Sequence, residues 1–308
     1  MQGEEARFFA PATIGNVGPG FDVLGLALAG LGDTVTARRV RAPGVRIVAV
    51  RGASRIPVAA EENTAGIAAM AILRKTGIDC GIELEIDKGL PLGSGLGGSA
   101  ASAAAGAAAV NVLVGSPLRK FDLLEPCLEA EAQVAGRHAD NVAPAVLGGL
   151  VLVQGLDPID VIRLPIPRGL QVVMAVPAFE VHTKDARDAL PREVSLATLV
   201  RNTASVASVV AACFTSDFAA LSRAILPDAI SRARAKLIPG ASDVIEAALS
   251  AGAIGCSISG SGPSIFALCR SERSRGEIGR AMRDAFASAG LSCETYGSAA
   301  DCPGVRRV

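Results

Sequence analysis

The stretch Pro91-Leu-Gly-Ser-Gly-Leu-Gly-Gly-Ser-Ala-Ala101 links two segments of different periodicity. Before it, residues Gly81–Asp87 alternate between apolar and charged side chains, which predicts a half-buried strand. After it, small residues from Ser99 to about Val114 predict a closely packed helix. A glycine-rich loop at a helix N-terminus presents backbone amides and the positive end of the helix dipole to an anion. The stretch therefore predicts a phosphate-binding loop.

This loop also fits other interpretations. It is not a Walker A motif, because no Lys-Ser or Lys-Thr pair follows its last glycines. Gly93, Gly95 and Gly98 satisfy the spacing G-x-G-x-x-G, so a dinucleotide-dependent oxidoreductase remains an alternative. That alternative requires a strand ending in an acidic residue about 20 residues further on, where residues 116–124 instead predict the start of a helix. A glycine turn that serves only strand–helix packing is the plainer interpretation, and the number of glycines weakens it.

Length and composition limit the class of protein. A chain of 308 residues, half of them hydrophobic, is long for one compact core, so we expect two domains. The 30 basic and 30 acidic side chains cancel, and aromatic residues make up 3% of the chain. These values disfavour a nucleic-acid or membrane partner. The seven cysteines contain no C-x-x-C pair, and the N-terminus lacks the pattern of a secretory signal, so we expect a cytoplasmic protein.

Strands and helices alternate along the chain around this loop, which predicts an α+β fold. Prolines cluster between residues 155 and 168, and we place a domain boundary there, giving domains 1–160 and 161–308. The predicted strands are Thr34–Val40, Val45–Val50, Gly81–Asp87, Gly148–Gln154, Leu170–Val176 and Cys293–Ser298, with a strand–turn–strand unit at Gly255–Cys269. The predicted helices are Glu62–Thr76, Ser99–Val114, Leu118–Gln133, Leu196–Phe214, Asp217–Ala229, Ser242–Ala251 and Arg275–Ala289.

Four further segments carry polar residues in sharply turned surroundings. The loop Pro11–Asp22 presents Asn16 and Asp22, and Ser257–Phe266 interrupts two apolar strands with glycine and serine. Taken alone, these fit turn-forming residues and a hairpin. His138 stands near Asp140 and Asn141, where a structural and a catalytic role are equally well supported. Arg187 and Arg234 fit surface charges, or a pair that grips a carboxylate if both lie near an active site.

Taken together and in this order, these segments resemble the GHMP superfamily of small-molecule kinases, which includes galactokinase and mevalonate kinase. Within it, the segments His138–Pro144 and Thr183–Arg187 are most similar to the homoserine kinase family. The resemblance spans residues 8 to 270. It implies a two-domain α+β fold, with an N-terminal βαβ nucleotide-binding domain and a C-terminal ferredoxin-like domain, and a homodimer. It also implies an enzyme that phosphorylates the hydroxyl of L-homoserine with ATP and Mg²⁺ in threonine biosynthesis, without a dedicated base. Another small-alcohol kinase of the superfamily remains an alternative.

The same resemblance implies roles for individual residues. Asn63 would lie near the adenine, and Ser99 and Glu131 would bind Mg²⁺, with Glu129 as the alternative to Glu131. Asn141 would lie close to the reacting oxygens and Thr183 over the substrate. The residues implied for homoserine are Asn16, Asp22, His138, Arg187 and Arg234. Those implied for ATP are Pro91, Leu92, Gly93, Ser94, Gly95, Leu96, Gly97, Gly98, Ser99, Ala100 and Ala101, of which residues 93–101 would hold the phosphates. One departure is Gly98, which stands where the family usually has a serine.

Overall fold

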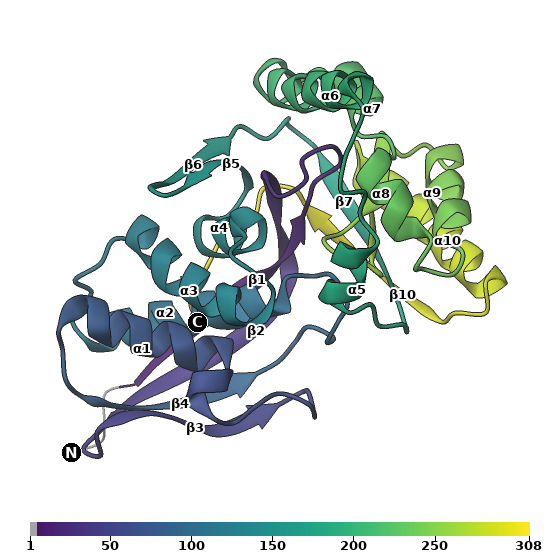
Figure 1. Cartoon of the computed structure of the whole chain (residues 1–308). Helices are drawn as coiled ribbons and strands as arrows, with labels where there is room; N and C mark the ends of the chain where they lie inside the picture. Colours follow the sequence, from purple (N-terminus) through teal and green to yellow (C-terminus); the bar gives the residue numbers. More distant parts are fainter. Residues whose placement is uncertain (1–4) are drawn as a thin grey trace.

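The computed structural model describes residues 5–308, apart from the side chain of Thr183, and contains two β-sheets with helices packed against them (Figure 1). The first sheet has seven strands, and the second has four. The first sheet consists of β1 (Glu5–Gly15), β2 (Leu24–Val40), β3 (Gly44–Arg51), β4 (Gly81–Asp87), β5 (Leu150–Leu156), β6 (Ile159–Leu164) and β11 (Arg306–Arg307). Because β11 pairs with β1, the C-terminal end of the chain returns to the first sheet.

The long strand β2 organises the first sheet. It pairs with β1 along most of its length, with β4 through residues 34–40, and with β5 through residues 24–26, all antiparallel. Strands β3 and β4 are parallel, and helix α1 (Thr64–Thr76) connects them. A parallel pair needs such a crossover connection. The predicted βαβ unit is therefore β3–α1–β4.

Helices cover one face of this sheet (Figure 1). They are α1, α2 (Gly98–Leu113), α3 (Leu124–Val134) and α4 (Ala139–Leu147). Helix α2 is buried along most of its length, and its alanines allow close approach to its neighbours. At Gly106, a Cβ atom would lie 3.0 Å from the carbonyl oxygen of Ala65 in α1, which shows how closely the two backbones approach. Small side chains thus bring the N-terminus of α2 into the centre of the molecule.

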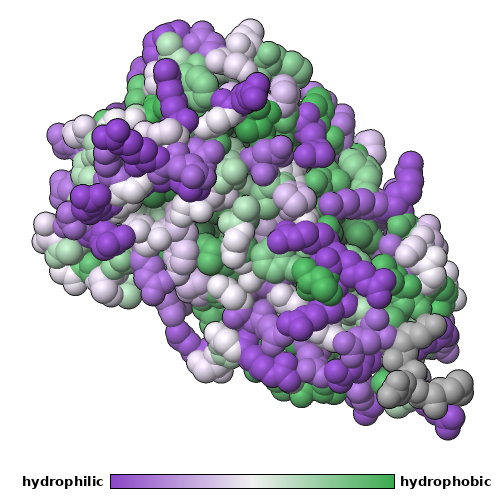
Figure 2. All heavy atoms as spheres, turned by 180° about the vertical axis from the view of Figure 1, so that it is seen from behind, coloured by the Kyte–Doolittle hydropathy of each residue, from purple (hydrophilic) through white to green (hydrophobic). Residues whose placement is uncertain are grey.

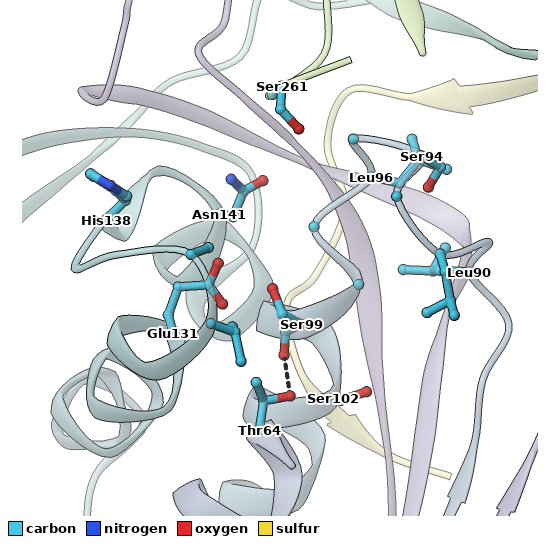
Figure 3. Close-up of a pocket in the computed structure, with 18 of the residues that line it drawn as sticks. Thr64, Leu90, Ser94, Leu96, Ser99, Ser102, Glu131, His138, Asn141 and Ser261 are labelled. Carbon is cyan, nitrogen blue, oxygen red and sulfur yellow. Dashed lines mark hydrogen bonds between the residues drawn. The ribbon is translucent and has the colours of Figure 1, made fainter. Parts of the chain in front are cut away.

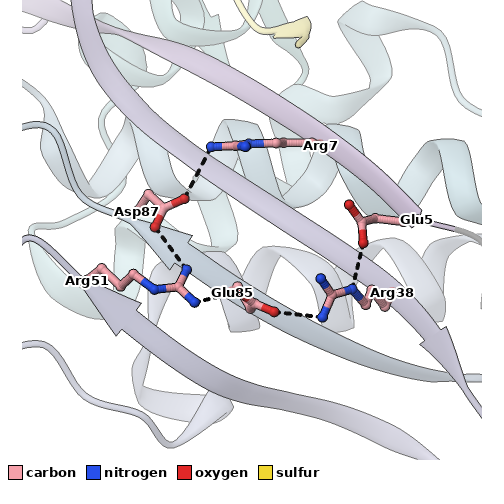
Figure 4. A network of polar contacts seen from close by, with 6 residues as sticks. All are labelled: Glu5, Arg7, Arg38, Arg51, Glu85 and Asp87. Atoms are coloured by element: carbon pink, nitrogen blue, oxygen red, sulfur yellow. Dashed lines mark hydrogen bonds and ion pairs between the residues drawn. The ribbon is translucent and has the colours of Figure 1, made fainter.

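The other face of the first sheet carries an ion-pair network that crosses four strands (Figure 4). Arg38 on β2 contacts Glu5 on β1 and Glu85 on β4, and Arg51 on β3 contacts Glu85 and Asp87. Such exposed pairs contribute little stability individually. Hydrophilic side chains gather on the lower half of the face shown in Figure 2. The alternation of apolar and charged residues in β4 thus separates a helix-covered face from a solvated one.

The second sheet has the strand order β10-β7-β9-β8, with antiparallel neighbours. Its strands are β7 (Gln171–Pro177), β8 (Gly255–Ile258), β9 (Ile265–Cys269) and β10 (Cys293–Ala299). Helices α5 (Thr183–Asp188), α6 (Leu196–Thr215), α7 (Phe218–Ala224), α8 (Ala229–Ala235) and α9 (Ala241–Ser250) lie between β7 and β8, and α10 (Glu272–Ser288) lies between β9 and β10. This βαββαβ order is ferredoxin-like. The predicted α+β fold class is confirmed.

Most predicted elements are confirmed, and two predictions are wrong for physical reasons. The helix predicted over Asp217–Ala229 ends at Ala224, and α8 begins only at Ala229, because Pro227 disfavours helix at the preceding residue and the Asp228 side chain caps α8. The segment 139–147, interpreted as a loop, is helix α4 although it contains Pro144. Burial of its apolar side chains against the first sheet outweighs the hydrogen bond that the proline cannot make.

Candidate active site

Three glycine-rich loops meet at one place between the two sheets. They follow β1, β4 and β8 in the chain. The amide of Thr13 donates to the carbonyl of Leu96 (3.0 Å). The amide of Gly260 donates to the carbonyl of Gly15 (2.9 Å). The hydroxyl of Ser259 donates to the carbonyl of Gly95 at 2.7 Å. These bonds hold the loops around a pocket of about 330 Å³, shown in Figure 3.

The predicted phosphate loop forms one wall of this pocket. Gly93, Gly95 and Gly97 have φ values of +61°, +76° and +66°, which residues other than glycine rarely adopt. Gly97 is the N-cap of α2, and no side chain caps this helix. The first amides of an α-helix have no acceptor within the helix. The loop and the helix N-terminus therefore present backbone donors toward the pocket, as an anion site requires.

The loop residues predicted to bind ATP divide into two groups. Residues 91–99 line the pocket. Ala100 and Ala101 are buried in α2, so only their backbones are available to a ligand. Asn63 also lines the pocket, but its side chain accepts a hydrogen bond from the amide of Ala65 and donates one to the carbonyl of Pro57. Its oxygen thus caps α1, and its nitrogen is bonded to the preceding loop.

A buried ion pair lies beneath the phosphate loop. The ammonium group of Lys88, at the end of β4, contacts the carboxylate of Asp33 on β2, and both side chains are almost fully buried. The same ammonium donates to the carbonyl of Gly98 and to the hydroxyl of Ser102, each at 2.9 Å. Ser102 in turn donates to Asp33 at 2.7 Å. This cluster ties the first turn of α2 to the sheet.

Glu131 on α3 faces Ser99 across the pocket (Figure 3). Its side chain is buried, and its Oε2 atom has no hydrogen-bond partner among the described residues. Burial raises the pKa of Glu131 to about 7, against the opposing effect of the Ser99 hydroxyl. Glu129 instead pairs with Arg74 at the surface. A buried carboxylate oxygen without a partner, beside a hydroxyl, fits a hard cation such as Mg²⁺.

Asp140 and Asn141 lie in the first turn of helix α4, with Asn141 beside Gly97 of the phosphate loop. The hydroxyl of Thr13 donates to Oδ1 of Asn141 at 2.8 Å. The carboxylate of Asp140 accepts the backbone amide of Asn16 at 2.9 Å. Burial, together with the nearby charge of Asp22, raises the pKa of Asp140 to about 7. Asp140 thus supports the turn at Asn16, whose φ is +57°.

The five residues predicted to bind homoserine lie together at the other end of the pocket. Asn16 accepts the backbone amide of Asp22 at 2.9 Å. The Asp22 carboxylate lies 3.4 Å from Nη2 of Arg187 and 3.6 Å from Nδ1 of His138. Arg234 is 4% exposed and donates to the carbonyl of Gly260 at 2.6 Å. The sequence separates these residues widely, and the fold brings them to one site.

His138 is neutral in this arrangement. Its Nε2 atom lies 2.8 Å from Nη2 of Arg187. Because a guanidinium group only donates, Nε2 accepts, and the proton is on Nδ1, which faces Asp22. Burial lowers the pKa of His138; the charge of Asp22 opposes this shift, and the two arginines reinforce it. The positive charge at this end of the pocket therefore comes from the arginines.

Sequence reasoning missed several residues that line the pocket or support its wall. Thr183 is the first residue of α5, but its side chain, predicted to lie over the substrate, is outside what the structure describes. Lys88 carried one signal, a charged residue directly after an amphipathic strand and next to a glycine loop, whereas Ser102 inside α2 carried none. Phe21 and Ser261 stand inside quoted glycine-rich segments, but as an apolar and a small residue they gave no chemical signal.

Comparison with known proteins agrees with this geometry. The family model described as "GHMP kinases N terminal domain" matches residues 63–149, and "GHMP kinases C terminal" matches residues 209–288. The first match contains the phosphate loop, Glu131 and Asn141, and the second contains Arg234 and the third glycine-rich loop. Fold and site together define a small-molecule kinase of the GHMP class.

Individual relatives narrow this class. Homoserine kinase of Arabidopsis thaliana is 47% identical over 91% of this chain and 78% of its own length. Homoserine kinase of Xylella fastidiosa is 43% identical over 98% of this chain and 94% of its own length. The crystal structure of homoserine kinase from Cytophaga hutchinsonii superposes with a TM-score of 0.96 at 44% identity, covering 99% of this chain and 97% of that one. The chain belongs to the homoserine kinase family.

Proposed function

We propose that this kinase transfers the γ-phosphoryl group of ATP to the hydroxyl of L-homoserine, giving O-phospho-L-homoserine, a step of threonine biosynthesis. One observation carries the proposal: a phosphate loop and a pair of arginines line the same pocket. An ATP-dependent kinase that acts on an amino acid needs both the phosphate loop and the arginines, since it must hold a polyphosphate and a carboxylate at a fixed separation.

The N-terminus of α2 supports binding of the ATP phosphates. Gly98, which replaces the usual serine, removes one hydroxyl but leaves its backbone amide as a donor. Glu131 and Ser99 are suited to hold Mg²⁺, because the carboxylate oxygen Oε2 has no protein partner and the hydroxyl faces it. Such an ion would neutralise charge on the phosphates. This charge pattern supports Mg-ATP as the phosphoryl donor.

The other end of the pocket supports an α-amino acid as the acceptor. Arg187 and Arg234 offer donors to a carboxylate, and their buried Nε atoms have no hydrogen-bond partner within residues 5–308. Asp22 and Asn16 provide oxygen atoms for an ammonium group. This arrangement favours homoserine over an acceptor without a carboxylate, such as galactose, and over a carboxylate without an ammonium group, such as mevalonate.

We expect catalysis without a dedicated base. Asp140, the carboxyl group next to Asn141, is 2% exposed, and one of its oxygens is engaged by the amide of Asn16. Phosphoryl transfer passes through a loose transition state, in which alignment and oriented dipoles supply most of the rate acceleration. Asn141, next to Gly97 of the phosphate loop, is well situated to orient the reacting oxygens. The residues of the site therefore need to position the hydroxyl and stabilise charge.

An assay of ADP release with Mg-ATP and L-homoserine tests this function. We expect turnover with L-homoserine that exceeds turnover with mevalonate or shikimate by orders of magnitude, and ³¹P NMR should identify a phosphomonoester. A preference for mevalonate or shikimate would assign the chain to another acceptor. The dinucleotide alternative requires a strand where residues 120–134 are helical. It predicts protection from unfolding by NAD and none by ADP, the reverse of what we expect.

We also propose that the protein is a homodimer in the cytoplasm, joined through α6. This helix is long and apolar enough, by length and composition alone, to cross a membrane, and 17% of its most apolar window is buried. Its exposed apolar residues begin with Leu196, Leu199 and Val200 and end with Phe214. They recur every three or four residues, with alanines between the two bulky ends. In an antiparallel pair of α6 helices from two copies, the N-terminal bulky residues of each helix would pack against Phe214 of the other.

Sedimentation equilibrium tests the dimer. We expect the wild-type chain to be a dimer at micromolar concentration, and the variants Leu199→Glu and Val200→Glu to be folded monomers. Flotation with liposomes tests the membrane alternative, for which we expect no association. A monomeric wild-type protein would contradict the dimer, and flotation would contradict the cytoplasmic location. We also propose that the chain divides into domains 1–160 and 161–308. We expect small-molecule partners and no nucleic-acid partner.

A further inference from the structure

Phe21 stands between the two arginines of the acceptor end. It lies in the loop after β1, between Gly20 and Asp22, and it is partly buried. Its ring centroid is 5.6 Å from Cζ of Arg187 and 5.3 Å from Cζ of Arg234. Both distances are within the range at which the face of an aromatic ring attracts a cation. One ring therefore contacts two guanidinium groups carried by two different helices, α5 and α8.

This arrangement addresses an electrostatic difficulty. Two guanidinium groups in one pocket repel each other, and Asp22 is the acidic residue that contacts Arg187. Arg234 is almost fully buried and is held by the carbonyl of Gly260. Burial lowers the pKa of Arg234; the charge of Asp22 opposes this shift, and the charge of Arg187 reinforces it. An acidic residue placed between the arginines would hold them together, but it would also occupy the donors that a ligand needs.

An aromatic ring attracts both cations without accepting their in-plane hydrogen bonds. The ring quadrupole interacts with the flat face of a guanidinium group, and the N–H donors stay directed outward along its edge. The buried Nε atoms of Arg187 and Arg234 have no hydrogen-bond partner among the described residues, so the ring contacts these cations without using their Nε donors. The ring is therefore suited to preorganise an anion site.

We propose that Phe21 is a positioning residue that holds Arg187 and Arg234 at the separation needed by the acceptor carboxylate, and so contributes to the selection of amino-acid acceptors. This inference rests on the proposed function. It goes beyond it by assigning part of the acceptor specificity to an apolar side chain that offers the substrate no hydrogen bond.

The test compares two acceptors that differ in the carboxylate. L-homoserine carries it, and 3-aminobutan-1-ol has a methyl group in its place. The variant Phe21→Leu keeps an apolar side chain but removes the ring face. We expect kcat/KM for L-homoserine to fall about tenfold, mostly through KM, as the loss of two cation–π contacts predicts. The amino alcohol, measured as a substrate or as a competitive inhibitor, should change less than about twofold, and the KM for ATP should not change.

Two further variants separate this role from simple packing. Phe9 on β1 makes the same kind of contact with Arg306, at 4.4 Å, and belongs to the first sheet. Phe9→Leu is the matched control, for which we expect an unchanged ratio of the two acceptors. Phe21→Tyr keeps the ring face and should restore most of the selectivity lost in Phe21→Leu, which also distinguishes a folding defect from a lost contact.

Each outcome decides the inference. A loss in Phe21→Leu that is equal for both acceptors, or no loss at all, would overturn the role of Phe21 and leave the proposed function standing. The same holds if Phe21→Tyr is as unselective as Phe21→Leu. A wild-type enzyme that does not phosphorylate L-homoserine would overturn both, because no acceptor carboxylate would then be involved.

Discussion

The contact between the phosphate loop and the third glycine-rich loop makes Gly95 a sensitive position in the site. Gly95 has a φ of +76°, and a Cβ atom added there would lie 2.5 Å from the carbonyl oxygen of Ser259 and 2.7 Å from that of Gly262. Both obstacles are backbone atoms, so no side chain can rotate away. Gly95→Ala must therefore displace one loop from the other.

The magnitude follows from these two effects. An alanine in the left-handed region costs about 1–2 kcal/mol, and overpacking a closely fitted contact costs about 1–3 kcal/mol. We expect Gly95→Ala to lower the free energy of unfolding by about 2–5 kcal/mol. Because a shift of about 1 Å in a positioned group can reduce the rate about a hundredfold, kcat/KM for ATP should fall by a similar factor.

Gly98, three residues away in the same loop, provides the matched control. Its Cβ would lie 3.4 Å from Nζ of Lys88, an ordinary contact, and its φ is not positive. Gly98→Ala should be neutral or stabilising by up to about 1 kcal/mol, since alanine favours helix over glycine. The chain has no tryptophan, so urea unfolding is best followed by far-UV circular dichroism. Equal stability and equal kcat/KM of the two variants would refute this account of the loop.

Three other predictions concern buried charges. Lys88→Met should lower the free energy of unfolding by about 3–5 kcal/mol, because it leaves the carboxylate of Asp33 buried and unpaired. Urea unfolding should show that the double variant Lys88→Met/Asp33→Leu recovers much of this loss. An equal loss in the single and the double variant would contradict the reasoning. Glu131→Gln should weaken apparent Mg²⁺ affinity in activity titrations roughly tenfold or more. The Mg²⁺ affinity of the wild-type protein should rise with pH toward the Glu131 pKa of about 7, since the metal binds the ionised carboxylate. A Glu131→Gln variant with wild-type Mg²⁺ affinity would exclude Glu131 as a ligand. Asp140→Asn should keep substantial activity, because an amide oxygen can still accept the Asn16 amide. The pKa of Asp140 is raised from 3.8 to about 7, so the native state binds more protons than the unfolded state across that range, and the free energy of unfolding falls as pH rises through it. Asp140→Asn should show a smaller fall in pH-dependent urea unfolding, and loss of all activity with the fold intact would instead identify Asp140 as a base.

Local sequence was sufficient where short-range physics decides the structure. The alternation in Gly81–Asp87 identified β4 with its observed bounds. It was insufficient where tertiary burial decides. In α4, Asp140, Asn141 and Pro144 all favour turns locally, yet the segment is helical because its apolar face packs against the sheet.

The same distinction applies to the site. Glycine spacing indicated the phosphate loop because backbone conformation is a local property. The pairing of Lys88 with Asp33 joins residues 55 positions apart, and no local pattern predicts it. Arg187 and Arg234 were ordinary surface charges by composition, and the family resemblance alone brought them into the site. Their common contact with Phe21 depends on the packing of three separate segments, which only the fold provides.

Glu131 and Asp140 are two buried carboxyl groups whose pKa values are raised to a similar extent. Their hydrogen-bond partners, rather than their acidity, distinguish a candidate metal ligand from a residue that supports a loop. Burial raises the pKa of both Glu131 and Asp140 to about 7. The Oε2 atom of Glu131 has no partner among the described residues, and an unpartnered buried acceptor is expected to be completed by a ligand. The Oδ2 atom of Asp140 is used by the amide of Asn16. We therefore expect a cation to complete the surroundings of Glu131, whereas Asp140 supports the loop that carries Asn16 and Asp22.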